Sequence, residues 1–391
     1  MFLKTVMERN QPLVRLGIEW QQNGVILPDT YLLDYDTILE NARSIKQAGD
    51  ANGVQNFFML KQIGRNPLIA RALTDMGYVG AVCVDFREAL TMVENQIPLG
   101  NVGHLVQIPR AALKKILRAK PVIVTVYTLE KAREISAVCT ELGLHQKLML
   151  RVLGEGDMLY SGQYGGFELQ ELDSAVRAIE AMPNVEVGGV CSFPCFLYDE
   201  AAQDILPMPN LRTVQTAAEM LRARGYRDLM LNTPSATCTH SIPMIAAAGG
   251  THGEPGHGLT GTTPYHAGHP DAEERPGYLY VSEVSHNLGD KAYCYGGGHY
   301  RRGHMKNALV GTTPENAKVV PVLPPDDSSI DYHFELQQNC PVSAAAVMAF
   351  RTQFFVTRSR VAVVKGLSSG KPELAGLYLS LIHISEPTRL G

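Results

Sequence analysis

Short apolar runs alternate with amphipathic stretches from about residue 31 to residue 260, and this pattern most limits how the chain can fold. Each run has the length of a strand, whereas the stretches between them carry the apolar spacing of a helix. The predicted strands are 31–36, 54–60, 81–85, 102–106, 122–127, 147–153, 185–192, 228–232 and 249–253. Alternating strands and helices predict a parallel sheet, in which the helices form the crossovers.

Eight strand–helix units follow the first strand within about 200 residues, which favours a closed (β/α)8 TIM-like barrel over an open sheet. No G-x-G-x-x-G turn follows the early strands, which weakens the open dinucleotide-binding alternative. The eighth strand, 249–253, is the weakest prediction because its residues have little strand propensity. Asp36 is expected to cap the helix that follows the first strand.

From about residue 265 the chain is rich in β-branched and aromatic residues, with turn signals between the runs. We therefore expect a barrel domain over residues 1–264 and a mostly β domain over residues 265–379. The last stretch, 380–391, resembles the translation of a sequencing adapter, so we expect it to be non-native and assign no role to His383.

Composition and charge exclude several function classes. The net charge of -4 argues against a nucleic-acid footprint. The N-terminus lacks the apolar core of a signal peptide, and no run of about 18 apolar residues is present to span a membrane. Seven scattered cysteines, including the C-x3-C pair Cys191 and Cys195, suggest reduced thiols in the cytoplasm.

The ends of the predicted barrel strands point to the chemistry, because barrel active sites lie there. Lys61 directly follows the first barrel strand, and Arg65 lies in the same loop. A lysine against apolar walls loses proton affinity and can attack a carbonyl, although a single lysine at a strand end more often reaches solvent. The loops after strands seven and eight, 232–241 and 253–264, are rich in small hydroxyl residues and glycine that suit a phosphate. Together they suit a phosphorylated aldehyde cofactor.

Five ordered motifs resemble the alanine-racemase-like, fold type III family of pyridoxal-phosphate (PLP) enzymes, closest to the enterobacterial YhfX-type subgroup. The similarity covers nearly all of the chain except the tail. The motifs are LLDYDTILENARSI with Asn41, FFMLKQIGRNP with Lys61, NTPSATC with Ser235 and Thr237, EPGHGLTG, and YCYGGGHYRRG with Tyr295.

The resemblance implies PLP held as a Schiff base on Lys61, an amino-acid substrate and a homodimer with shared active sites. It implies that Tyr295 is a second catalytic group facing the other side of the substrate, contributed by a partner subunit. The remaining cofactor-binding residues that it implies are Arg151, Phe193, Ser235, Thr237, Glu254, Gly256 and His257.

Three positions depart from the family pattern. The lysine is followed by Q-I-G-R-N-P, Phe193 occupies the place of a ring-stacking histidine, and Glu254 stands where racemases have arginine. A carboxylate beside the ring nitrogen favours the protonated ring and a stronger electron sink. This supports racemisation, but also decarboxylation, dehydration or aldol cleavage of a D-amino acid.

Other functions stay open at this stage. Eight of the twelve histidines fall between His240 and His304, including His266 and His269, but their spacing matches no zinc pattern, so no metal is expected. A non-catalytic PLP carrier would keep the lysine and the phosphate loops without needing the second domain. An aldolase that uses its lysine without a cofactor would not need two phosphate loops unless its substrate is phosphorylated.

Overall fold

A computed structural model describes residues 2–379, and its chain divides into two compact units. The barrel unit contains Arg43–Leu60 and Pro67–Gly258, and the β-rich unit contains residues 2–42, the turn Lys61–Asn66 and residues 259–379. The adapter-like segment 380–391 and His383 lie outside the described residues.

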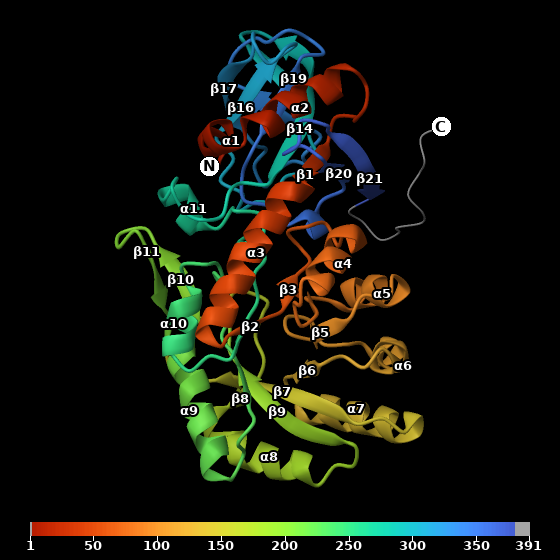
Figure 1. Cartoon of the computed structure of the whole chain (residues 1–391), viewed down its shortest axis with the longest axis vertical. Helices are drawn as coiled ribbons and strands as arrows, with labels where there is room; N and C mark the ends of the chain where they lie inside the picture. Colours follow the sequence, from red (N-terminus) through yellow and green to blue (C-terminus); the bar gives the residue numbers. More distant parts are fainter. Residues whose placement is uncertain (1, 380–391) are drawn as a thin grey trace. The chain divides into compact units, whose positions relative to one another are not determined.

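The barrel unit is built on a parallel sheet with helices α4 to α9 outside its strands (Figure 1). The sheet order begins with β2 and ends with β3, and these two segments are one strand interrupted at Phe57. The nine segments of this order are therefore eight strands, and the TIM-like (β/α)8 barrel predicted from the sequence is confirmed. The segments are β2 (Gln55–Asn56), β3 (Phe58–Met59), β4 (Ala81–Cys83), β5 (Leu99–Val102), β6 (Ile123–Val126), β7 (Gln146–Leu153), β9 (Val185–Cys191), β12 (Met230–Asn232) and β13 (His252–Gly253).

Helices connect successive barrel strands, as the crossovers of a parallel sheet require. Local sequence sets several of their ends: Asp85 accepts a hydrogen bond from the Glu88 N–H at 2.9 Å, and Gly143 ends a helix with φ 63°. Helix α3 (Tyr35–Asn52) precedes the first barrel strand. The connecting helices are α4 (Pro67–Asp75), α5 (Phe86–Glu94), α6 (Arg110–Arg118), α7 (Leu129–Leu142), α8 (Leu172–Glu180), α9 (Pro209–Ala223) and α10 (Ile242–Ala247). Short additions are β8 (Phe167–Glu168), η1 (Leu169–Glu171) and the hairpin of β10 (Phe196–Asp199) and β11 (Asp204–Pro207).

One barrel strand lies earlier in the chain than predicted. The sequence predicted a strand over 102–106, whereas β5 ends at Val102. Gly103 ends it with φ 91°, and a Cβ there would lie 2.6 Å from the Thr125 carbonyl oxygen. His104 consequently lies in the bend after the strand rather than within it.

The β-rich unit is a nine-stranded sheet in the order β15-β18-β17-β16-β19-β14-β1-β20-β21. Because β15 also pairs with β14, six of these strands form a closed ring of antiparallel pairs. The strands are β1 (Thr30–Asp34), β14 (Tyr278–Leu288), β15 (Lys291–Tyr295), β16 (Asn307–Gly311), β17 (Lys318–Leu323), β18 (His333–Leu336), β19 (Ala345–Met348), β20 (Arg360–Lys365) and β21 (Glu373–Leu379). The helical segments of this unit are α1 (Leu3–Arg9), α2 (Gln11–Gln22), α11 (Pro264–Gly268) and η2 (Phe354–Val356).

The first predicted strand belongs to this unit, although the sequence placed it with the barrel. In β1, Leu32 pairs with Leu279 of β14 on one side and with Ala362 of β20 on the other. A run buried on both faces fits any sheet interior, so the sequence pattern did not reveal its partners. Asp34 rather than Asp36 accepts the Thr37 N–H at 3.2 Å at the start of α3.

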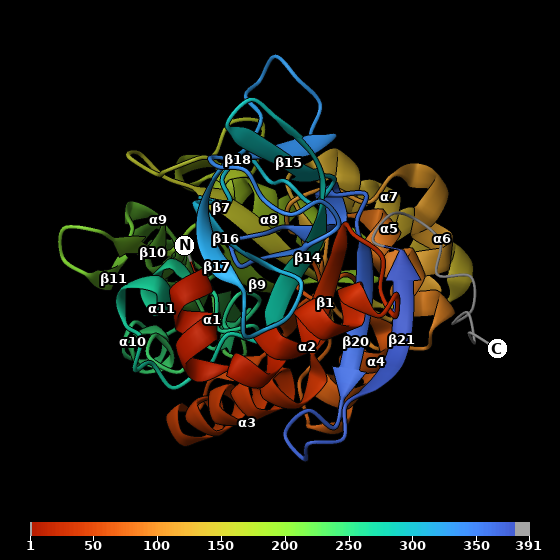
Figure 2. The same cartoon turned by 90° about the horizontal axis from the view of Figure 1, so that it is seen from above.

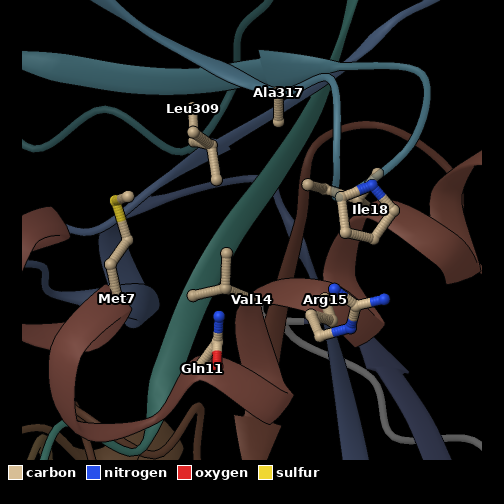
Figure 3. A pocket seen from close by; sticks show the side chains of 8 residues that line it. Met7, Gln11, Val14, Arg15, Ile18, Leu309 and Ala317 are labelled. Atoms are coloured by element: carbon tan, nitrogen blue, oxygen red, sulfur yellow. The ribbon is translucent and has the colours of Figure 1, made fainter.

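Helices α1 and α2 pack their apolar faces on this sheet (Figure 2). A shallow pocket of about 120 Å³ lies between them and β16, and Figure 3 shows side chains from α1, α2 and β16 around it. Arg15 at this pocket forms an ion pair with Glu315 at 2.6 Å. The lining residues are Met7, Gln11, Val14, Arg15, Ile18, Leu309, Pro314 and Ala317.

A search of residues 2–379 finds no helix with the length and apolar character needed to cross a membrane. All seven cysteines are buried, and none of them forms a disulfide.

Asp29 gives a testable pH dependence of stability. It accepts hydrogen bonds from Tyr280 and Ser359, yet burial raises the pKa of its carboxyl from 3.8 to about 6. The folded chain therefore binds this proton more tightly than the unfolded chain, and the unfolding free energy should fall as the pH rises from about 4 to about 6. Asp29→Asn should remove this decline in denaturant unfolding measured across that range.

Ser359→Ala provides the opposite variant, because it removes a hydrogen bond that lowers the pKa of Asp29. The decline should then extend to higher pH. An unchanged pH profile in both variants would contradict this role for Asp29.

Candidate functional site

The carboxylate of Glu254 lies at the end of β13, inside the barrel unit, with its side chain 1% exposed. Its Oε1 accepts hydrogen bonds from Nδ2 of Asn232 at 2.6 Å and from Nδ2 of Asn101 at 3.3 Å. Thr125 donates to Oδ1 of Asn101 at 2.7 Å, which turns the amide nitrogen of Asn101 toward the carboxylate. Asn232 on β12 and Asn101 on β5 thus hold one oxygen of Glu254 in a fixed position.

The other oxygen, Oε2, has no hydrogen-bond partner among the described residues. Nε2 of His104 lies 3.6 Å from it, beyond hydrogen-bond distance, and both side chains are 1% exposed. A buried carboxylate oxygen without a donor is costly, so this oxygen fits a cationic N–H group supplied by a ligand.

The loops after β12 and β13 meet at Thr237. The backbone N–H of Glu254 donates to Oγ1 of Thr237 at 3.1 Å, and Ser235 donates to the Phe196 carbonyl oxygen at 2.6 Å. A Cβ at Gly258 would lie 2.4 Å from the Thr237 carbonyl oxygen, so only glycine allows this approach.

Gly256 and His257 follow Glu254 in the same turn. Gly256 is buried, and the side chain of His257 is partly exposed. The turn therefore combines bare backbone with a polar side chain, as a phosphate site requires.

Arg151 on β7 is fully buried, and hydrogen bonds to two protein oxygens fix the orientation of its guanidinium. Its Nη1 donates to Oη of Tyr127 at 2.9 Å and its Nη2 to the Gln163 carbonyl oxygen at 2.7 Å. Tyr127 in turn donates to the His104 carbonyl oxygen at 2.6 Å. Burial raises the pKa of Tyr127, and Arg151 partly offsets the shift, so Tyr127 is a neutral donor near pH 7. Arg151 thus adds a fixed positive charge to this side of the barrel.

Phe193 lies after β9, and its ring meets His104 edge to face, with centroids 5.7 Å apart and an interplanar angle of 85°. Its centroid lies 5.6 Å from that of Tyr160. The barrel thus has a phenyl ring after β9, at the position where the family has a ring-stacking histidine. A histidine reaches Phe193 from the loop after β5 instead.

Sequence reasoning did not select Asn101, His104 or Asn232. All three lie within or just after barrel strands. These residues could have been selected by the rule that polar residues at the ends of barrel strands form the site. His104 was not recognised as such a residue because the predicted strand 102–106 contained it, whereas β5 ends at Val102.

Lys61 and Tyr295, the two predicted catalytic residues, belong to the β-rich unit. Lys61 opens the turn after β3, and its carbonyl oxygen accepts the Phe354 N–H at 3.0 Å. Tyr295 ends β15, is 39% exposed, and its ring centroid lies 5.8 Å from that of His333.

The side chain of Asn41 donates to the Leu259 carbonyl oxygen at 3.0 Å and to the Arg275 carbonyl oxygen at 2.8 Å. It thereby fixes the chain that follows the turn of Glu254.

The remaining candidate groups are the clustered histidines and the cysteines. Within residues 2–379, no cluster of three or more histidine, cysteine, aspartate or glutamate side chains could hold a metal ion. Burial raises the pKa of Cys191 to about 12, so this thiol is protonated near pH 7. Cys195 is likewise fully buried, and burial raises its pKa.

Comparison with known proteins gives two matching family models. The model for the alanine racemase N-terminal domain matches residues 33–264, and the model for the YhfX-like C-terminal domain matches residues 279–374. The "Uncharacterized protein YhfX" of Escherichia coli K12 is 43% identical over 383 residues, which cover 97% of this chain and 98% of that protein.

Solved structures with the same fold have low sequence identity. D-threonine aldolase from Filomicrobium marinum has a TM-score of 0.66 at 16% identity, covering 90% of this chain and 94% of its own. Alanine racemase from Clostridium difficile 630 in complex with cycloserine has a TM-score of 0.65 at 14% identity, covering 91% and 99%. D-threo-3-hydroxyaspartate dehydratase from Delftia sp. HT23 has a TM-score of 0.62 at 15% identity, covering 90% and 97%.

Asn232→Ala tests the carboxylate network. It removes a hydrogen bond to a buried charged group, so the unfolding free energy should fall by about 2 kcal/mol. Asn52→Ala is a matched control, because Asn52 is exposed and donates only to the Ala48 carbonyl oxygen of its own helix. Urea unfolding at pH 7 should show a change of at most about 0.5 kcal/mol for Asn52→Ala. Equal effects in the two variants would contradict the network.

Proposed function

The chain belongs to the alanine racemase N-terminal domain family, and from this premise we propose that it is an enzyme acting on amino acids, with Lys61 as its cofactor-binding lysine. Members of this family bind pyridoxal 5'-phosphate, which is the cofactor of this chain. The observation that carries the proposal is the open Oε2 of Glu254, a buried anionic oxygen with no hydrogen-bond partner in the described chain. A protonated pyridine nitrogen is the N–H group that the cofactor offers to such an oxygen.

Each proposed binding residue has a chemical task. Glu254 would bind the ring nitrogen, Phe193 would pack on the ring, and Arg151 would supply positive charge. The phosphate would be bound by hydroxyl groups and backbone N–H groups of the two loops that meet at Thr237. The residues proposed for the phosphate are Ser235, Thr237, Gly256 and His257.

When bound, PLP draws electrons from a bond at the α-carbon of an amino acid into its ring. The protein chooses which bond breaks by the proton donors and acceptors that it places there. For racemisation, Lys61 and Tyr295 would move protons on opposite sides of the α-carbon, each contributing about 10²–10⁴-fold. We propose that Tyr295 acts from the partner subunit of a homodimer, and that the protein is cytoplasmic.

A second candidate is supported by Glu254 itself. A carboxylate holds the ring protonated and favours reactions that need a strong electron sink, including decarboxylation, dehydration and aldol cleavage of a D-amino acid. A D-threonine aldolase and a D-threo-3-hydroxyaspartate dehydratase are among the proteins that share this fold. A non-catalytic carrier of PLP is the alternative from another class, and it would not need the β-rich unit with Tyr295.

The assignment of Lys61 predicts a spectroscopic result. The purified protein should absorb visible light, and borohydride should fix PLP to the peptide that contains Lys61. Lys61→Ala should abolish both and lower turnover by about 10³-fold or more, because an acid–base group is lost with the attachment point. Lys61→Arg keeps the positive charge and should show the same losses. A colourless wild-type protein that contains no PLP would exclude the proposed function.

The reaction type can be determined with a panel of L- and D-amino acids in deuterated water. NMR should show deuterium at the α-carbon with inversion if the protein is a racemase. Loss of carbon dioxide, ammonia or an aldehyde would identify the second candidate instead. Bound PLP without turnover of any amino acid would favour the carrier. Tyr295→Phe should slow racemisation in one direction more than simple α-proton exchange.

A further inference from the structure

Glu254 has a second neighbour that the proposed cofactor chemistry does not use. Nε2 of His104 lies 3.6 Å from Oε2, the oxygen that lacks a hydrogen-bond partner, and both side chains are 1% exposed. The position of Glu254 is set by the bonds to its other oxygen from Asn232 and Asn101. A small movement of the imidazole would therefore bring Nε2 into hydrogen-bond distance of Oε2.

Within residues 2–379, Oε2 of Glu254 has no hydrogen-bond partner when the ring nitrogen is absent. A buried carboxylate is stable only with a positive partner or a proton of its own. His104 is a titratable side chain that faces Oε2, and a proton on Nε2 would make it a charged donor to that oxygen. When a protonated ring nitrogen binds Oε2, a second positive charge on His104 would repel it in a region of low dielectric constant.

We propose, resting on the proposed function, that His104 is a positioning residue that shares Oε2 of Glu254 with the ring nitrogen of the cofactor. Without the ring, Nε2 carries a proton and is paired with the Glu254 carboxylate. Without the ring, His104 would be an imidazolium with protons on both Nδ1 and Nε2. When the ring nitrogen binds, the Nε2–H bond would break and a ring N–H bond would form, with the proton passing through Oε2. His104 would keep its Nδ1 proton and become neutral, so the proton lost by Nε2 is the one gained by the ring and no other reactant is needed.

The other groups around His104 are compatible with this exchange. Tyr127 donates to the backbone carbonyl oxygen of His104, so it leaves the imidazole nitrogens to other partners. Arg151 lies one hydrogen bond further on, and its positive charge favours loss of the proton from His104 once Glu254 is occupied. Cys191 interacts electrostatically with both Arg151 and Glu254 and, with its pKa raised to about 12, adds no charge. Phe193 presents an apolar ring to the imidazole and contributes no titratable group.

A purely structural role for His104 predicts something different. An imidazole that only fills space beside Phe193 would titrate independently of the cofactor and of Glu254. The proposed exchange instead makes the protonation of His104 depend on both. The two roles are therefore separated by a measurement of the imidazole itself rather than by activity.

The test is NMR of the full-length protein with ¹³C-labelled histidine, titrated from pH 4 to pH 9 without PLP and with PLP bound. His104→Phe identifies the signal of His104. The pH midpoint of that signal should fall by at least one unit, about a tenfold loss of proton affinity, when PLP binds. In the cofactor-free protein, Glu254→Gln should lower the midpoint by a similar amount.

His252 is the matched control. It is buried in the same barrel unit, and burial lowers its pKa to about 4. Its ring stacks on Phe57 rather than facing a carboxylate, so its signal should not respond to PLP or to Glu254→Gln. His252→Phe identifies this signal.

Two results would overturn the inference. One is a His104 midpoint that stays the same when bound PLP is evident from the visible spectrum, which would leave the proposed function intact. The other is an unchanged midpoint in cofactor-free Glu254→Gln, which needs no PLP. If PLP does not bind the wild-type protein at all, the proposed function fails separately, and the coupling between His104 and Glu254 is still decided by the cofactor-free comparison.

Discussion

The pairing of β13 with the strand that begins the barrel is the constraint on which the rest of the barrel unit depends. His252 and Gly253 pair with Gln55 and Asn56, and this short contact closes a parallel sheet that would otherwise have two open edges. Closure brings the carboxyl ends of all eight strands into one ring. Asn101, Asn232 and Glu254 are far apart in the sequence but meet there because β5, β12 and β13 belong to the same closed sheet.

Electrostatics then decides what that ring can bind. The two amide donors hold one oxygen of Glu254 and leave the other open, so a buried negative charge is positioned but only half satisfied. The open oxygen can accept a hydrogen bond from a cationic N–H group, supplied by a ligand or, as proposed above, by His104. His104 at 3.6 Å connects that oxygen to the aromatic wall formed with Phe193.

The local sequence was a good guide to the elements and to part of the site. The alternation of strands and helices predicted the barrel, including the short β13, and the loops after strands seven and eight do meet at Thr237. Glu254 was selected from its motif and lies inside the barrel. The sequence was a poor guide where burial is complete on both faces: β1 shows the same apolar run as a barrel strand, but pairs with β14 and β20.

The sequence by itself therefore determined the class of the fold, the family and the residues that carry its motifs, because periodicity and spacing are local properties of the chain. The tertiary structure alone decided which oxygen of Glu254 is open and which side chains surround it. His104 became visible only when Gly103 was seen to end β5 before it. Contacts of this kind join residues about 150 positions apart, as Asn101 and Glu254 are, and no local pattern in the sequence encodes a distance between them.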